Sequence, residues 1–208
     1  IERRSLAIGP AWLLLAAMTA CAPSVRAFRA PGPGLPAGAS LAFVPLTNLT
    51  EVEHAGRLFT DKLVVEAGRL RLFDVQDPGV VLGALRRLRI LTPDRISAEQ
   101  MRSLAEVVGT NYLLPGTVTQ CVEGGEFAGQ HPAAALSLRF VDGSDGRVLW
   151  AATLARSGND SETVFGLGRV HTLDELSSRM ARDLVRSMHE LTRPGRPLRA
   201  PRRTEAKP

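Results

Sequence analysis

The sequence predicts an α/β (α+β) fold, a single layered domain in which helices pack on a mixed sheet of about five strands. Three observations support this prediction. Apolar segments with strand character alternate along the chain with segments of helical period. Most of the helical segments begin with residues typical of an N-terminal cap. Two segments with alternating apolar residues flank a run of turn-forming residues, which indicates a β-hairpin.

The expected strands are apolar segments of the length that strands usually have. They are residues 41–46, 70–75, 112–122, 132–141 and 148–154. In the fourth segment the apolar Leu136, Leu138 and Phe140 alternate with the polar Ser137 and Arg139, so we expect one face to be buried. The turn sequence Asp-Gly-Ser-Asp-Gly at residues 142–146 joins this strand to the last one.

The expected helices are marked by their caps and by one apolar face each. The caps are Thr50 with Glu53, Asp77 with Pro78, Ser97 with Gln100, and Thr172 with Glu175. We expect Gly68 to end the first helix and Gly109 to end the third, because glycine readily adopts the left-handed conformation found there. The last helix aligns Leu173, Leu176, Met180, Leu184, Met188 and Leu191 at helical spacing.

Charge is distributed unevenly along the 208 residues, which have a net charge of +5. Residues 40–192 contain 16 Lys and Arg against 19 Asp and Glu, so the predicted domain is slightly acidic. Residues 193–208 contain six basic residues, four prolines and one acidic residue, and we expect them to be a disordered basic tail. This distribution argues against a nucleic-acid partner. The tail either binds anionic envelope polymers or is simply solvated.

The first residues have the features of a bacterial lipoprotein signal peptide. Two arginines precede an apolar run, and small residues lead to Cys21. The segment resembles a lipobox, in which the cysteine is acylated after cleavage, so residues 1–20 are the predicted signal and Cys21 the lipidation site. In the sorting pattern it resembles, Ala22 favours the outer membrane. A plain signal peptide with an incidental cysteine, or an uncleaved anchor, are the alternatives. Pro and Gly in residues 21–39 indicate a flexible tether.

No motif for catalysis, metal binding or a cofactor stands out. His54, His131, His171 and His189 show no metal-ligand spacing, and no phosphate loop or nucleophile elbow is present. Cys121 falls within an expected strand, where a buried structural thiol is the simplest interpretation and a reactive or bridged thiol is the alternative. We therefore predict a protein that is not an enzyme and has no cofactor.

Several motifs follow one another in residues 40–190. An apolar strand with proline, then Asn and Thr, occurs at residues 40–50. A Thr-Asp-x-Leu pattern follows at residues 60–63, and Leu-Phe-Asp-Val at residues 72–75. Residues 104–118 contain the end of a helix, then Gly-Thr-Asn-Tyr, an apolar stretch and Gly-Thr-Val, and residues 138–150 form the expected hairpin. In this order the motifs resemble the curli-secretion lipoprotein (CsgG) superfamily, with residues 104–118 as the best match.

This resemblance implies a lipid-anchored outer-membrane protein facing the periplasm. The superfamily includes PelC, FlgO and LpoB-type proteins. The resemblance favours an assembly or accessory role in envelope secretion or biogenesis through an unidentified protein partner, with a homo-oligomeric ring as one arrangement. Residues 156–171 are too short and polar for the membrane hairpins of a pore. A regulator of a peptidoglycan synthase and a periplasmic enzyme are the alternatives.

Overall fold

The computed structural model describes residues 25–36, 38–125, 131–160 and 168–193. The predicted signal segment, Cys21 and nearly all of the expected basic tail lie outside the described residues. The elements in chain order are β1 (Arg26–Arg29), β2 (Ser40–Phe43), β3 (Thr47–Asn48), α1 (Ala55–Leu70), β4 (Asp74–Val75), α2 (Pro78–Arg87), η3 (Pro93–Arg95), α3 (Ala98–Val108), β5 (Tyr112–Leu114), β6 (Gly116–Val122), β7 (Ala133–Asp142), β8 (Val148–Ser157), α4 (Leu173–Met188) and η4 (His189–Thr192).

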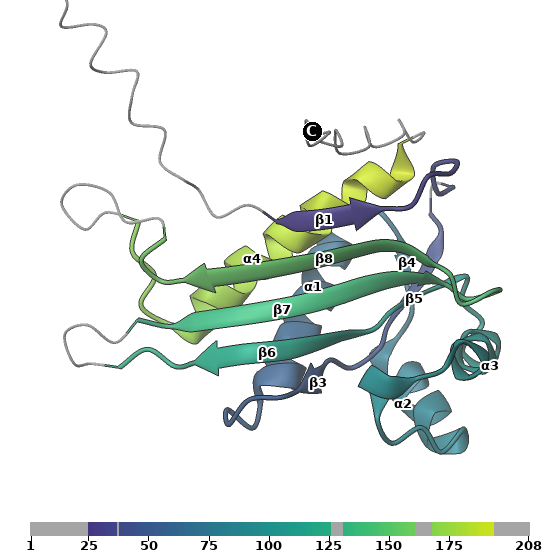
Figure 1. The fold of residues 1–208 in the computed structure, drawn as a ribbon, viewed down its shortest axis with the longest axis horizontal. Coiled ribbons are helices and arrows are strands. Elements are labelled where there is room, and N and C mark those ends of the chain that lie inside the picture. The colour runs from purple at the N-terminus through teal and green to yellow at the C-terminus, as the bar shows by residue number, and fades with distance from the viewer. Residues whose placement is uncertain (1–24, 37, 126–130, 161–167, 194–208) are drawn as a thin grey trace, which may run out of the picture.

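The described strands form one mixed sheet, which confirms the predicted fold class (Figure 1). Its order is β1-β8-β7-β5-β2-β4, and β6 pairs with both β7 and β3. The contacts of β2 with β4 and β5, and of β3 with β6, are parallel, whereas the remaining contacts are antiparallel. The predicted hairpin is the long β7–β8 pair.

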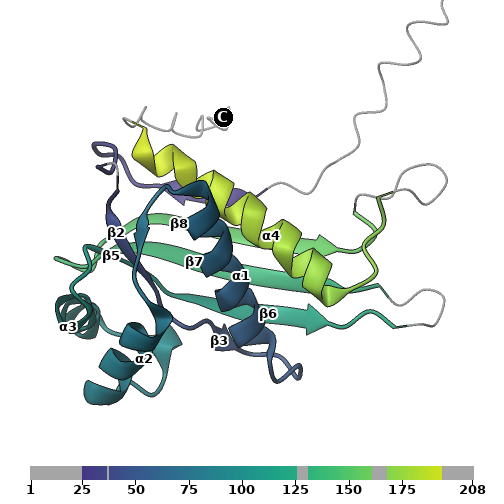
Figure 2. The ribbon, with the colours of Figure 1, turned by 180° about the vertical axis from the view of Figure 1, so that it is seen from behind.

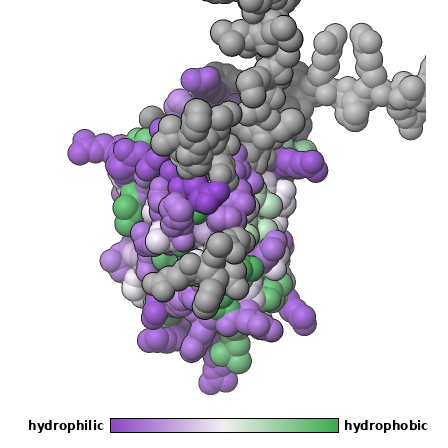
Figure 3. Space-filling view, turned by 90° about the vertical axis from the view of Figure 1, so that its left-hand side faces the viewer, coloured by the Kyte–Doolittle hydropathy of each residue, from purple (hydrophilic) through white to green (hydrophobic). Residues whose placement is uncertain are grey.

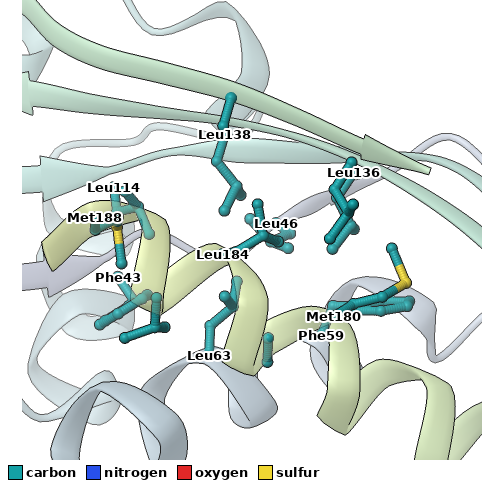
Figure 4. Close-up of a cluster of buried hydrophobic side chains, with 14 of the residues drawn as sticks. Phe43, Leu46, Phe59, Leu63, Leu114, Leu136, Leu138, Met180, Leu184 and Met188 are labelled. Atoms are coloured by element: carbon teal, nitrogen blue, oxygen red, sulfur yellow. The ribbon is translucent and has the colours of Figure 1, made fainter. Parts of the chain in front are cut away.

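Helices cover the two faces of the sheet unequally. Figure 2 shows α1 and α4 side by side across one face, while in Figure 1 the strands β1, β8, β7 and β6 face the viewer with no helix in front of them. The α1–α4 layer packs on the sheet through a large apolar cluster that includes Phe59, Leu63, Leu138 and Leu184 (Figure 4). These residues are all fully buried.

A second, smaller cluster holds α2 and α3 against the other face of β2 and β5. Successive residues of β2 serve the two clusters in turn, because strand side chains alternate between faces. Leu41 and Phe43 belong to the large cluster, whereas Ala42 and Val44 belong to the small one with Leu104. This double burial explains why residues 41–44 are all apolar.

Two prolines break the central strands at the same level. Pro45 separates β2 from β3, and Pro115 separates β5 from β6. Proline has no N–H to donate to a ladder, so each strand loses its regular pairing there. The next amide, Leu46 N–H, donates to Thr60 Oγ1 at 3.0 Å, and Thr60 Oγ1 in turn donates to the Gly56 carbonyl at 2.7 Å. The expected continuous strand over 112–122 is therefore two strands.

Three of the four expected helix starts are confirmed. Asp77 Oδ1 accepts hydrogen bonds from the amides of Gly79 and Val80. Ser97 and Gln100 form the complete capping box, and Thr172 Oγ1 accepts from the amide of Glu175.

The predicted cap at Thr50 is wrong. The first helix begins at Ala55 after His54, because Asn48 Oδ1 holds the Thr50 amide and hydroxyl in the preceding loop. It also continues past Gly68 to Leu70 and ends at Arg71, which has the left-handed conformation expected of a glycine, with a φ of 50°. The expected strand over 70–75 is thus reduced to Asp74–Val75.

The expected flexible tether over residues 21–39 is wrong over much of its length. Arg26–Arg29 forms the edge strand β1, which pairs antiparallel with β8. The following residues turn back over the C-terminal end of the domain, where Leu35 N–H donates to the Leu191 carbonyl at 2.8 Å. Proline prevents helix in this segment but does not prevent a strand at a sheet edge.

Candidate functional site

The four histidines do not form a metal-binding group in the part of the chain that the structure describes. His54 lies 3.6 Å from Glu123 through Nε2 and Oε1, with both side chains about half exposed. The His171 carbonyl and Pro132, the residue after His131, both lie beside Gly124, which follows Glu123, whereas His189 follows α4. Within the described ranges, no group of three or more His, Cys, Asp or Glu side chains could hold a metal ion.

Cys121 lies on β6 and is buried in the large apolar cluster. Burial raises the pKa of the thiol, and the charge of Glu123 raises it further. A thiol with a raised pKa is a poor nucleophile at neutral pH, because the thiolate is the reactive form. This environment agrees with the predicted structural role.

An open depression of about 630 Å³ lies beside the C-terminal end of α3. Glu106, Tyr112 and Asp142 are among the residues that line it. Asp142 Oδ1 already accepts hydrogen bonds from the amide and hydroxyl of Ser144, as an aspartate does in a turn. Burial and the neighbouring Asp142 charge raise the pKa of Tyr112. The Ser144–Asp142 contact in this depression is thus a local bond of the turn between β7 and β8, and three exposed surfaces are further candidates for function.

The first candidate surface is the exposed side of α2 and the residues that follow it. Val80 is 50% exposed, Leu82 42% and Leu91 90%. Three exposed arginines accompany them: Arg86, Arg87 and Arg89. We call these six residues the basic α2 surface.

The second candidate surface lies where the loop before α1 meets the end of β6. Leu49 is 64% exposed and Val122 46%. Three exposed acidic residues accompany them: Glu51, Glu53 and Glu123. We call these five residues the acidic loop surface. Figure 3 views the molecule from the side on the left of Figure 1, and shows small hydrophobic patches set among mainly hydrophilic residues.

The third candidate surface is the part of the sheet that no described helix covers. Short side chains point outward from this part of the sheet. Ser137 of β7 pairs with Thr153 of β8, and Ala135 and Ala151 lie two residues before them on the same strands. Phe28 of β1 lies opposite Ala151 and is 53% exposed. We call this the open sheet face.

The sequence did not reveal these surfaces. Apolar residues at 80, 82 and 91 are indistinguishable by composition from the core residues Val81, Leu85 and Ile90 between them. The run of arginines at 86, 87 and 89 was the only signal on α2 that could have suggested an exposed binding side.

The fold defines an α+β domain in which helices pack on one mixed sheet. The chain is similar in structure to a point variant of the PelC dodecamer from Paraburkholderia phytofirmans, with a TM-score of 0.56 and 20% identity over 82% of this chain and 98% of that one. A second PelC dodecamer structure from that organism gives a TM-score of 0.52 at 18% identity, covering 81% of this chain and 98% of that one.

Another match is lipoprotein GNA1162 from Neisseria meningitidis, with a TM-score of 0.53 and 16% identity over 73% of this chain and 99% of that one. The sequence matches no protein-family model, and a search of curated proteins found no match. The predicted resemblance is thus confirmed at the level of the CsgG/PelC-like lipoprotein fold. Among the described helices, none combines the length and apolar character needed to cross a bilayer.

Proposed function

We propose that this protein is a non-enzymatic, lipid-anchored outer-membrane lipoprotein that faces the periplasm and acts as an assembly or accessory component of envelope secretion or biogenesis. The observation that supports this proposal best is the PelC-like fold, which spans 98% of a relative described as a dodecamer. The protein functions through protein–protein contacts, as a homo-oligomeric ring.

The anchor in this proposal is an acylated Cys21. Each buried methylene of an acyl chain contributes about 0.8 kcal/mol to membrane association, so two or more chains hold a protein stably. Four residues separate Cys21 from Arg26, where β1 begins. Fully extended, the five steps from Cys21 to Arg26 span at most about 18 Å. An acylated protein would therefore hold its domain close to the bilayer.

This short connection bears on the alternative of a peptidoglycan synthase regulator. Such a regulator must reach from the outer membrane to the cell wall, and the expected tether would have supplied that reach. Because β1 and the residues up to Pro36 pack on the domain, only the residues between Cys21 and β1 can extend from the membrane. A partner at or near the membrane fits this geometry better.

The basic tail is a second point of attachment in the proposal. Its arginines are suited to anionic lipid headgroups or wall polymers, and it follows directly from η4. Removing residues 194–208 should weaken sedimentation with anionic envelope fractions. Unchanged sedimentation would identify a solvated tail.

Anchoring and assembly are tested separately. Cys21→Ser should move the protein from the membrane to the soluble fraction of cells, and retention in the membrane would contradict the anchor. Light scattering of the detergent-extracted wild-type protein should give the mass of a multimer many times 22.4 kDa. A mass corresponding to one chain would contradict the ring.

A further inference from the structure

Two surfaces of this chain expose large apolar side chains beside charges of opposite sign. On the basic α2 surface, Leu91 is 90% exposed, and on the acidic loop surface Leu49 is 64% exposed. Exposed apolar residues rimmed by charge are typical of protein-binding sites. These two surfaces are therefore candidates for burial against a partner.

Charge makes the two surfaces complementary. The basic α2 surface has three arginines, with Asp77 at the start of the helix as its acidic neighbour. The acidic loop surface has three glutamates, with His54 and Arg57 as its basic neighbours. Each surface keeps its net sign when these neighbours are included, so contact between the two would bring opposite charges together.

The acidic loop surface is held in place before any partner binds. Asn48 Nδ2 donates to the carbonyls of Val52 at 2.8 Å and Glu53 at 3.3 Å, while its Oδ1 accepts from the Thr50 amide at 3.0 Å. The Leu49 amide donates to the Val118 carbonyl at 3.0 Å. A loop that is already ordered loses less conformational entropy when it binds.

The basic α2 surface is fixed in the same way. The Ile90 amide donates to the Leu85 carbonyl at 2.9 Å and the Arg89 amide to the Arg86 carbonyl at 3.1 Å, which is the Schellman pattern of a helix end. Arg89 occupies the left-handed position, with a φ of 55°, where glycine is usual. This ending places Leu91 in solvent beside the arginines.

The two surfaces lie on different sides of the molecule. In Figure 1, α2 is at the lower right, and the loop between β3 and α1 is at the lower left. Figure 2 shows the same separation from behind. One chain cannot satisfy both surfaces by itself, so each is free for a neighbour.

We propose that the basic α2 surface of one copy docks on the acidic loop surface of the next copy. This inference rests on the proposed ring, and it identifies the contact that closes it. Contacts between two different surfaces of identical chains are heterologous, and such contacts form rings when the rotation between neighbours closes. Leu82 and Leu91 would be covered by Leu49 and Val122, with the arginines facing the glutamates.

Charge reversal tests this contact with the full-length protein in detergent. The variants are Arg86→Glu with Arg87→Glu on α2, and Glu51→Arg with Glu53→Arg on the loop. Either pair alone places like charges at every contact, so we expect the mass to fall from that of the multimer to that of one or two chains. Circular dichroism of each variant checks that the fold is retained.

Mixing the two charge-reversed proteins is the decisive measurement. In an alternating arrangement every contact again joins opposite charges, so the equimolar mixture should recover the wild-type mass. Arg139→Glu on the open sheet face is the matched control and should leave the mass unchanged. A wild-type mass in either charge-reversed variant, or no recovery in the mixture, would overturn the inference.

Cross-linking provides a readout that does not depend on charge. Leu91→Cys and Leu49→Cys replace exposed side chains, so both variants should fold. Oxidation of a protein with both substitutions should yield ladders of linked chains, whereas Leu91→Cys with Arg139→Cys should not. A wild-type multimer without the first ladder would place the contact elsewhere, on the open sheet face for example. A wild-type monomer would contradict the ring itself.

Discussion

Glu66 and Arg69 form a two-pronged ion pair on α1. Arg69 Nε donates to Glu66 Oε2 at 2.9 Å, and Arg69 Nη2 donates to Glu66 Oε1 at 2.6 Å. Arg182 of α4 lies 3.5 Å from the same Oε1 through its Nε. The Glu66 side chain is only 10% exposed, and its contact with Arg182 links the two helices that cover the sheet.

Glu66→Gln should destabilise the domain by about 1–2 kcal/mol, because charge-assisted hydrogen bonds contribute more than neutral ones. The two arginines keep access to water, which limits the loss. Urea denaturation followed by circular dichroism measures the free energy of unfolding. Asp61→Asn, at an exposed position of the same helix, is the control and should change it by less than about 0.5 kcal/mol. Equal effects of the two substitutions would show that the pair does not stabilise the fold.

Acid should weaken this contribution of Glu66. The hydrogen bonds and charge of Arg69, with the charges of Arg182 and Arg186, lower the pKa of Glu66 below its ordinary value of 4.5 despite its burial. The unfolded chain therefore binds the proton more readily than the folded one, and folding stability rises with pH in this range. The contribution is complete above about pH 4.5 and is lost as the pH falls through the folded pKa.

The measurement is the difference in unfolding free energy between wild type and Glu66→Gln as a function of pH. We expect a constant difference from about pH 7 down to about pH 5, and a shrinking one in more acidic solution. A difference that grows on acidification would contradict the assigned sign.

Arg29 joins the two ends of the folded domain. Its Nη1 donates to the Glu190 carbonyl at 2.5 Å, and its Nη2 donates to the Arg193 carbonyl at 2.6 Å. Arg29→Ala should therefore loosen β1 and the residues up to Pro36, and raise their amide hydrogen exchange several-fold while the core stays protected. Arg26→Ala, on the same strand, should have a smaller effect. Unchanged exchange in the Arg29 variant would show that pairing with β8 alone holds the segment.

Local sequence signals predicted what depends on neighbouring residues. The caps at Asp77, Ser97 and Thr172 were found because each side chain bonds an amide two or three residues away. The edge strand β1 was missed because its partners are about 120 to 164 residues distant, in β8 and after α4. Thr50 failed as a cap because the competing bond from Asn48 depends on where β3 pairs with β6.

The candidate surfaces escaped prediction for a related reason. A helical pattern shows that one face is apolar, but the residues beside that face become buried or exposed according to how the helix lies on the sheet. Leu82 is exposed, whereas Val81 next to it is fully buried. The charged composition of the domain was readable, but folding alone places the arginines of the basic α2 surface and the glutamates of the acidic loop surface on different sides.

The left-handed residues that end α1 and α3 make a matched pair for substitution. Arg71 has a φ of 50° and Gly109 a φ of 75°. A residue with a side chain is strained in this conformation by roughly 1 kcal/mol. A Cβ added at Gly109 would meet no neighbouring atom within 4 Å, so backbone strain is the main effect of a substitution there. Gly109→Ala should therefore lower the free energy of unfolding by about 1 kcal/mol.

Arg71→Gly should have the opposite sign, with a gain of up to about 0.5 kcal/mol, because relief of the strain is partly offset by the greater freedom of glycine in the unfolded chain. Urea denaturation of both variants against wild type measures the two changes. Gly68→Ala, within the last turn of α1, is the control for a glycine in ordinary helical conformation, and it should stabilise the protein. Destabilisation by Arg71→Gly would mean that the arginine side chain contributes more than its backbone strain costs.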